Sequence, residues 1–296
     1  MREYLRIILT CHDAVQANSK SFKQITVHHA SRTISMDTWR LIPLETHNAF
    51  MNMAIDEAIL TARISERVPN TLRFYQWKPS SVSIGKNQNA QDEVYQDNTR
   101  KRGVDVVRRI SGGGAVYHDQ NGEVTYSVIS KTEKLGGDIT IVYNRIYEAV
   151  TDALRLMGVP ADFNTGDTKN CPNLTVGNKK ISGSSQTIKR GTVLQHGTIL
   201  LDIDLQKMFQ YLRVRSTSNC SQVAQIAARK ITSIKTELHH SITAETVANA
   251  LAQGFKAILK INLEPAKLTT YETTLAEELF KEKYTTNMWN ESGKTV

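Results

Sequence analysis

The residue types with the clearest chemical potential lie in one glycine-rich stretch of this 296-residue chain, between residues 104 and 130. An apolar run that is typical of a buried strand ends in Arg108 and Arg109, and three glycines follow at 112–114. Glycine lets backbone N–H groups approach a ligand closely, and arginine forms charge-assisted hydrogen bonds with phosphate or carboxylate oxygens. The spacing therefore favours an anion site, although a tight hairpin with a solvated arginine pair has the same pattern.

A second stretch, residues 171–186, combines a cysteine, lysines and a glycine. Lys180 precedes Ser182 and Gly183, so a strand would present its ammonium group beside a residue that admits a close approach. Such a cation can stabilise negative charge that develops on a carbonyl or phosphoryl group, and the alternative is a solvated turn lysine. Cys171 lies in the preceding loop, where nearby lysines would lower the pKa of its thiol and make it a nucleophile. The alternative for Cys171 is an inert, half-buried thiol.

Two histidines lie in or near these stretches. His118 and His196 could carry protons or orient a ligand, although an isolated histidine is more often structural. Asp119 follows His118 directly, and the side chains of adjacent strand residues point to opposite faces. This adjacency disfavours a catalytic triad of Ser111, His118 and Asp119.

Hydrophobic periodicity predicts the elements that must position these residues. Helical spacing of apolar residues predicts helices near residues 48–66, 139–157, 244–259 and 275–284. Short apolar or alternating runs predict strands near residues 72–74, 82–84, 104–107, 124–128, 175–182 and 193–204. The glycines at 112–114 would lie in the turn between two paired strands. Because strands and helices do not alternate regularly, we expect an α+β fold with mostly antiparallel or mixed sheets flanked by helices.

Composition narrows the function classes. The net charge of +8 suits an acidic protein partner or a phosphate-bearing substrate as well as nucleic acid. No concentrated basic tract or nucleic-acid-binding motif is present, so we expect no nucleic acid partner. The apolar runs are far shorter than the roughly 18 residues of a membrane span, and the first residues do not resemble a secretory signal. Three widely spaced cysteines fit a reducing compartment, so we expect a cytoplasmic protein without a disulfide framework or metal site.

The motifs together resemble the lipoate-protein ligase and octanoyltransferase family, whose relatives are the biotin protein ligases. The resemblance runs through RFYQWKPSSVSIGKNQ (73–88), RRISGGGAVYHD (108–119), NLTVGNKKISGSSQ (173–186), LQHGTILLDID (194–204) and AEELFKEKYTTNMWN (276–290). It implies a biotin/lipoate ligase-like catalytic domain, related in fold to class II aminoacyl-tRNA synthetases, over residues 36–290. We expect residues 1–35 to be an extension that is untranslated or disordered, and we expect no C-terminal accessory domain.

The same resemblance implies roles for individual residues. Lys180 corresponds to the family's essential lysine, which contacts the acyl carbonyl and the adenylate phosphate. Substrate or nucleotide binding is implied for Arg109, Ser111, Gly112, Gly113, Gly114, Ala115, His118, Asn173, Ser182, Gly183, His196 and Gly197.

Two chemistries occur in this family. In a ligase, our first interpretation, ATP and Mg²⁺ activate lipoate or octanoate as acyl-AMP before transfer to a lysine of a lipoyl domain. The unbroken SGGGAVYHD segment favours this chemistry. In one octanoyltransferase branch, the alternative, a loop cysteine takes octanoate from acyl carrier protein as a thioester, without ATP. Cys171 lies in that loop, although closer to Lys180 than the spacing of that branch.

The resemblance also implies the partners. The expected acceptors are lipoyl-domain proteins, namely the E2 subunits of 2-oxoacid dehydrogenases and the glycine cleavage H protein. Their acidic character would account for the basic balance of this chain. A ligase without an accessory domain would need a separate accessory subunit. A non-catalytic acyl-binding protein is the interpretation from another class, and the presence of both Lys180 and the complete glycine stretch disfavours it.

Overall fold

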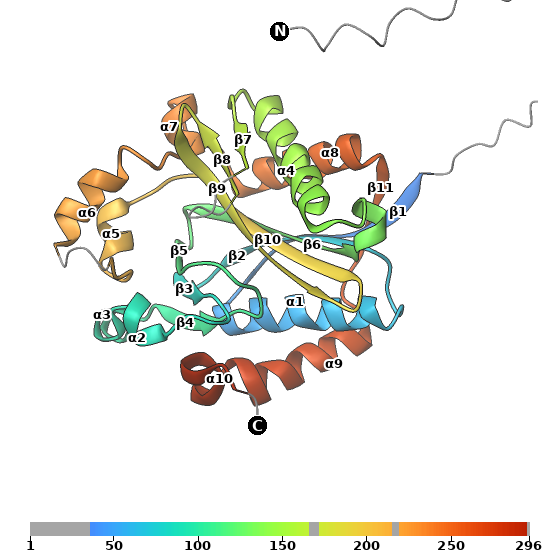
Figure 1. Ribbon diagram of the computed structural model, residues 1–296, viewed down its shortest axis with the longest axis horizontal. Coiled ribbons are helices and arrows are strands. Elements are labelled where there is room, and N and C mark those ends of the chain that lie inside the picture. Colours follow the sequence, from blue (N-terminus) through green and yellow to red (C-terminus); the bar gives the residue numbers. More distant parts are fainter. Residues whose placement is uncertain (1–35, 166–171, 215–218, 295–296) are drawn as a thin grey trace, which may run out of the picture. The chain divides into compact units, whose positions relative to one another are not determined.

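The computed structural model describes residues 36–165, 172–214 and 219–294, and Figure 1 draws the other residues as a grey trace. The predicted extension at 1–35 and the candidate nucleophile Cys171 therefore lie outside the described residues. Within the described ranges, the chain forms an eight-stranded sheet and a three-stranded sheet, and helices pack beside both. The predicted α+β class with mixed sheets flanked by helices is confirmed.

The larger sheet has the strand order β11-β1-β2-β6-β10-β9-β8-β7. Its strands are β1 (Asp37–His47), β2 (Thr71–Trp77), β6 (Glu123–Lys131), β7 (Asp162–Asn164), β8 (Asn173–Val176), β9 (Lys179–Lys189), β10 (Thr192–Leu200) and β11 (Ile261–Pro265). Strand β1 pairs in parallel with both β2 and β11, and the other neighbours are antiparallel. Strand β6 is buried on both faces, which explains its nearly continuous burial pattern.

Two helical layers cover the larger sheet. They are formed by α4 (Ile139–Leu156) with α8 (Ala244–Leu259) on one face, and α1 (Ala49–Ile64) with α9 (Thr270–Leu279) on the other (Figure 1). Each of these helices begins after a polar residue whose side chain accepts a backbone N–H bond: Asn48, Asp138, Thr243 and Thr269. Among the helices of the described residues, none is long and apolar enough to cross a bilayer.

The three-stranded sheet carries the glycine segment, which we define as residues 109–115. It consists of β3 (Ser81–Ile84) between β4 (Asp105–Arg108) and β5 (Val116–His118). The glycine segment passes from β4 on one side of β3 to β5 on the other. The prediction that these glycines turn between two paired strands is therefore wrong, because β3 takes both strands as neighbours and the strand predicted at 124–128 belongs to the larger sheet.

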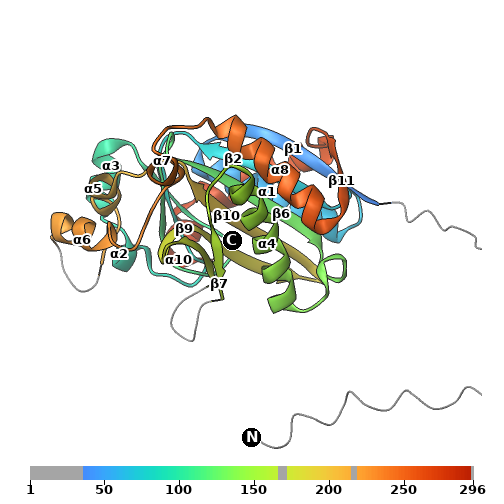
Figure 2. The ribbon, with the colours of Figure 1, turned by 90° about the horizontal axis from the view of Figure 1, so that it is seen from above.

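Short helices complete the described chain. They are α2 (Ala90–Glu93), α3 (Gln96–Arg102), η1 (Thr132–Leu135), α5 (Leu205–Phe209), α6 (Cys220–Ala227), α7 (Ile234–Leu238), η2 (Phe280–Tyr284) and α10 (Asn287–Ser292). The segment after α5 is joined to α2 and α3, because the Tyr95 N–H donates to the Tyr211 carbonyl and the Arg213 N–H to the Glu93 carbonyl, each at 2.8 Å. Helices α2, α3 and α5 gather with α6 in one corner (Figure 2).

The predicted boundaries hold best for the long helices. The helices predicted at 139–157 and 244–259 are confirmed as α4 and α8. The fourth begins earlier than predicted, at Thr270, because Thr269 and Glu272 form a capping box there. The segment predicted as a strand at 175–182, with GNKK (177–180) as a turn, forms the two strands β8 and β9. Gly177 and Asn178, with φ angles of 52° and 67°, make the hairpin turn between them.

Candidate active site

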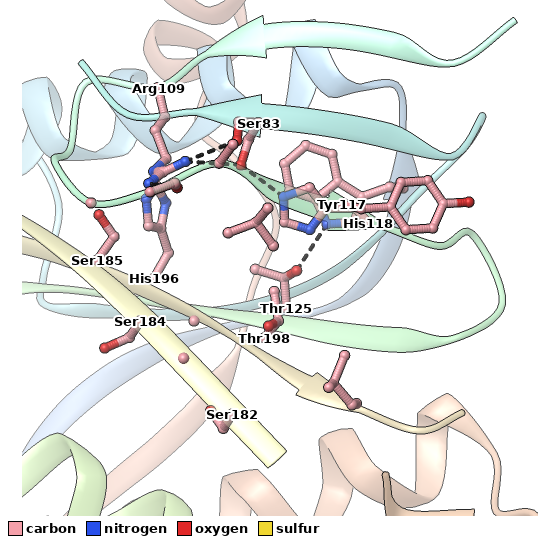
Figure 3. Close-up of a pocket in the computed structure, with 18 of the residues that line it drawn as sticks. Ser83, Arg109, Tyr117, His118, Thr125, Ser182, Ser184, Ser185, His196 and Thr198 are labelled. Carbon is pink, nitrogen blue, oxygen red and sulfur yellow. Dashed lines mark hydrogen bonds between the residues drawn. The ribbon is translucent and has the colours of Figure 1, made fainter. Parts of the chain in front are cut away.

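A cavity of about 370 Å³ lies between the three-stranded sheet and strands β9 and β10 (Figure 3). One part of its lining is apolar and comes largely from β10, α5 and the segments that follow them: Leu200, Met208, Phe209, Leu212 and Ile231. The other part contains the glycine segment and a few polar side chains. A ligand with an apolar chain and a polar head matches such a lining.

Arg109 holds the glycine segment in shape. Its Nη2 donates to the carbonyl oxygens of Gly112 and Gly114, both at 2.7 Å, and its Nη1 donates to the Ser83 carbonyl at 3.1 Å. The Ser185 hydroxyl also donates to the Gly112 carbonyl, at 2.6 Å. The guanidinium lines the cavity and at the same time turns these loop carbonyls toward itself.

Arg108 does not face the cavity, so the prediction of an arginine pair for a ligand is wrong for this residue. Adjacent strand residues point to opposite faces, and the Arg108 side chain is only 2% exposed. Its guanidinium donates to six backbone carbonyls, those of Gly85, Lys86, Gln88, Trp289, Asn290 and Glu291. The Arg108 guanidinium thus connects β4 with the segment after β3 and with α10.

Lys180 lies at the rim of the cavity with its backbone paired to a neighbouring segment. Its N–H donates to the Lys230 carbonyl at 2.8 Å, and its carbonyl accepts from the Thr232 N–H at 2.9 Å. The side chain folds over Gly183, because a Cβ atom built there would lie 2.7 Å from the Lys180 Nζ. A glycine at position 183 is therefore what allows this lysine conformation.

His196 on β10 is hydrogen-bonded through both ring nitrogens. Its Nδ1 lies 3.0 Å from Asp56 Oδ2, and its Nε2 lies 2.7 Å from the Ser111 hydroxyl. Asp56, on α1, also accepts from Arg73 at 2.8 Å and from the Tyr75 hydroxyl at 3.0 Å. All of these side chains are buried, and together they connect α1 to the start of the glycine segment.

His118 on β5 has a parallel arrangement. Its Nδ1 lies 2.7 Å from Glu123 Oε1. Its Nε2 lies 2.8 Å from the Ser83 hydroxyl, to which Arg109 also donates at 3.1 Å (Figure 3). The indole of Trp77 stacks on the imidazole with ring centroids 3.9 Å apart. His118 is therefore fixed in both position and ring orientation.

The cavity brings together most of the residues for which binding roles were predicted. Those that line it are Arg109, Gly113, Gly114, Ala115, His118, Lys180, Ser182, Gly183, His196 and Gly197. Ser111 and Gly112 are not in the lining; Ser111 is fully buried and bonds to His196. Asn173 pairs with Gly183 between β8 and β9. Cys171 lies outside the described residues, but its neighbour Pro172 lines the cavity.

Sequence reasoning missed the buried carboxylates that fix the two histidines. Asp56 falls beside the apolar stripe of α1 and is buried, and a buried acid is rare unless it is paired, so its position was a usable signal. Glu123 and Ser83 gave no such signal, because each belongs to a strand that is buried on both faces. Their partners became clear only from the fold.

Replacing Gly85 with alanine is expected to destabilise the glycine segment. A Cβ atom at Gly85 would lie 2.1 Å from the Gly113 carbonyl oxygen, so the backbone must move, at a cost of about 1–3 kcal/mol in the free energy of unfolding. Gly112→Ala is the matched control, because a Cβ there meets no atom within 4 Å. Chemical denaturation of both variants checks this expectation, and equal stabilities would contradict it.

The Asp56 contacts predict how stability depends on pH. Burial alone would raise the pKa of Asp56, but the hydrogen bond with His196 and the charge of Arg73 outweigh it, so the pKa lies below its ordinary value. A carboxyl whose pKa is lower in the folded state contributes stability above its unfolded-state pKa, near 3.9, and loses that contribution as the pH falls through the folded-state pKa. Denaturation from pH 6 down to roughly pH 2 should therefore show a steeper loss in the parent than in Asp56→Asn. Equal slopes would contradict the assignment.

Comparison with known proteins agrees with this architecture. The family model of the lipoyl protein ligase A/B catalytic domain matches residues 48–256 of this sequence. The octanoyltransferase LipM of Brevibacillus brevis is 35% identical over 86% of this chain and 99% of its own length, and that of Bacillus subtilis is 32% identical over 86% and 98%. Among solved structures, a bipartite lipoate protein ligase from Thermoplasma acidophilum aligns with a TM-score of 0.76 at 30% identity, over 88% of this chain and 98% of its own. A lipoate-protein ligase A bound with ATP aligns with a TM-score of 0.74 at 31% identity, over 86% and 99%.

The fold, the cavity and these relatives define an enzyme of the transferase or ligase class. More particularly, the chain belongs to the lipoyl protein ligase A/B catalytic-domain family.

Proposed function

We propose that this enzyme is an octanoyltransferase that takes an octanoyl group from acyl carrier protein and passes it to a lysine of a lipoyl domain. The observation that carries the proposal is the function named for the relatives just described, which align with this chain over nearly their full lengths. They support the transferase interpretation better than the ATP-dependent ligase that we placed first from sequence. The acceptor class is supported by the Thermoplasma ligase, which was described together with its E2 lipoyl domain.

The site offers the parts that this reaction requires. The apolar side chains from β10 and α5 can cover an octanoyl chain. Pro172 lines the cavity, and Cys171 is its covalent neighbour in the sequence. The Pro172 carbonyl accepts from the Tyr147 hydroxyl at 2.9 Å, and Ser184 donates to that hydroxyl at 2.8 Å. These bonds anchor the residue that follows the proposed nucleophile.

The proposed reaction has two balanced steps. In the first, the Cys171 thiolate attacks the carbonyl of the octanoyl thioester, and the carrier thiolate leaves and takes a proton from solvent. In the second, the amine of the acceptor lysine attacks the enzyme thioester, so that a C–N bond forms, the C–S bond breaks and the amine proton passes to solvent. Lys180 would stabilise the oxyanion that develops in both steps, and the glycine segment would supply backbone N–H groups around the acyl head.

The second candidate is the ATP-dependent lipoate ligase. It is favoured by the complete glycine segment and by the likeness to a lipoate-protein ligase A bound with ATP. In this chemistry ATP and Mg²⁺ activate the acyl group, no cysteine is needed, and a separate accessory subunit could be required.

The donor requirement separates the two candidates. A purified lipoyl domain is incubated with the full-length protein and either octanoyl acyl carrier protein or lipoate with ATP and Mg²⁺, and its intact mass is measured. The proposal expects an octanoyl mass increase from the carrier without ATP. Modification that occurs only with lipoate and ATP would overturn it in favour of the ligase.

The proposed nucleophile is tested by trapping the acyl-enzyme. Octanoyl acyl carrier protein alone should add one octanoyl group to the parent, and Cys171→Ser should abolish this hydroxylamine-sensitive thioester. Cys220→Ser is the matched control, because the Cys220 thiol is bonded to the Phe209 carbonyl at 3.0 Å and should not carry the acyl group. Retention of the thioester in Cys171→Ser would contradict the assignment.

A further inference from the structure

The Asp56–His196–Ser111 network has a defined direction. Asp56 accepts from Arg73 and Tyr75 and acts as an acceptor, which assigns a proton to His196 Nδ1. The His196 Nε2 is then an acceptor, and the Ser111 hydroxyl donates to it across 2.7 Å. The direction of the bond fixes the hydroxyl rotor of Ser111, which is the third residue of the glycine segment.

The hydrogen-bond network of His118 also ends on the glycine segment. The bond to Glu123 assigns a proton to His118 Nδ1. With Nε2 as the acceptor, the Ser83 hydroxyl donates to it and accepts from Arg109 Nη1. Through its Nη2, Arg109 then binds the Gly112 and Gly114 carbonyls. The two histidines therefore restrain the glycine segment at neighbouring points, one through a hydroxyl and the other through a guanidinium.

An acid, a histidine and a serine in a row also describe the nucleophilic triad of hydrolases, but burial excludes that role here. Ser111 is 0% exposed and is not part of the cavity lining. A carbonyl carbon in the cavity would have no path to the Ser111 oxygen, and a nucleophile must come within about 3–3.5 Å of the atom that it attacks. Both ring nitrogens of His196 are already bonded, so it presents no open nitrogen to the cavity either.

We propose that His196 is a positioning residue for acyl transfer, and that it acts by holding Ser111 and so setting the course of the glycine segment. The inference rests on the proposed function, because its effect is on the transfer rate. Displacing a backbone donor by about 1 Å can slow a reaction by roughly 10²-fold even where the fold persists. The network therefore contributes to the rate through the position of the glycine segment.

The test compares variants that lose the hydrogen bond between Ser111 and His196 with a variant that can keep it. Ser111→Ala and His196→Asn both lose the Ser111–His196 bond, whereas the longer amide of His196→Gln can still reach the serine hydroxyl. Steady-state transfer from octanoyl acyl carrier protein should show kcat lowered about 10–100-fold in the first two, with KM for the donor little changed. His196→Gln should recover part of the loss. The double variant Ser111→Ala/His196→Asn should be no slower than the slower single variant, because both substitutions remove the same hydrogen bond between Ser111 and His196.

The controls separate this idea from a loss of stability and from failure of the proposed function. Ser130→Ala removes a similarly buried serine hydroxyl, one that donates to the Lys131 carbonyl on β6, and should keep the parental kcat. If Ser111→Ala is unfolded at the assay temperature, the comparison of His196→Gln with His196→Asn decides. A parental kcat in folded Ser111→Ala, equal rates of the two amide variants, or losses that multiply in the double variant would overturn the proposal. A parent protein that transfers no octanoyl group would instead refute the proposed function.

Discussion

Replacing Lys180 with alanine is expected to lower the rate of lipoyl-domain acylation by about 10²–10³-fold. The ammonium group of Lys180 lies at the cavity rim over Gly183, where it can meet an acyl carbonyl oxygen as that oxygen gains negative charge. Its side chain is exposed, so its removal leaves no cavity, and the free energy of unfolding should change by less than about 0.5 kcal/mol. The measurement is the initial rate of mass increase of a lipoyl domain at saturating donor.

Lys179→Ala is the matched control for this prediction. Lys179 is the neighbouring residue of β9, and its side chain points to the opposite face of the strand. A rate near that of the parent would show that the specific position, and not the loss of one positive charge, accounts for the effect. The assignment of Lys180 fails if its alanine variant acylates at the parental rate, or if both alanine variants are equally slow.

Replacing Glu272 with alanine is expected to cost about 3–5 kcal/mol in the free energy of unfolding. Glu272 on α9 receives two hydrogen bonds from the Arg40 guanidinium of β1, at 2.5 and 2.8 Å, and its side chain is fully buried. The same carboxylate accepts the Thr269 N–H at 2.8 Å and so caps α9. Removing it leaves a buried arginine without its counter-charge and breaks one of the two hydrogen bonds of the capping box, and chemical denaturation measures the sum of both losses.

A surface pair provides the comparison for Glu272. Asp37 and Lys134 lie 3.3 Å apart with about half of each side chain exposed to solvent, at 44% and 49%. Asp37→Ala should therefore cost no more than about 1 kcal/mol. The double variant Arg40→Met/Glu272→Leu should regain much of the stability lost in Glu272→Ala, because apolar groups of similar size need no counter-charge. A loss in Glu272→Ala as small as that in Asp37→Ala would contradict the buried-pair argument.

The long helices were predictable from the sequence because each repeats its apolar positions over several turns. The amphipathic pattern of α4 and α8 recurs often enough to fix both their type and their ends. The three-stranded sheet was not predictable, since its strands are three or four residues long. Such short segments carry little periodic signal, and which strand β3 would take as a neighbour depended on the rest of the fold.

Some residues of the candidate site could also be predicted from local sequence motifs, and others could be found only from the fold. The glycine segment and Lys180 are local motifs, so the sequence pointed to them directly. Arg109 also lines the cavity as predicted, whereas the role of Arg108 was misread because nothing local distinguishes two adjacent arginines. The pairing of Asp56 with His196 spans 140 residues, and no spacing rule connects positions so far apart. Contacts of this kind come from tertiary structure alone.

The bonds of Arg108 bear on when the site can form during synthesis. The guanidinium binds the carbonyl of Glu291, 183 residues further along the chain. At the usual elongation rates of about 5–20 residues per second, the ribosome needs roughly 10–40 s to travel from one to the other. During that interval, β4 and the segment after β3 lack the carbonyls of α10 that will complete their support. The nascent enzyme should therefore acquire activity only after α10 has emerged from the ribosome.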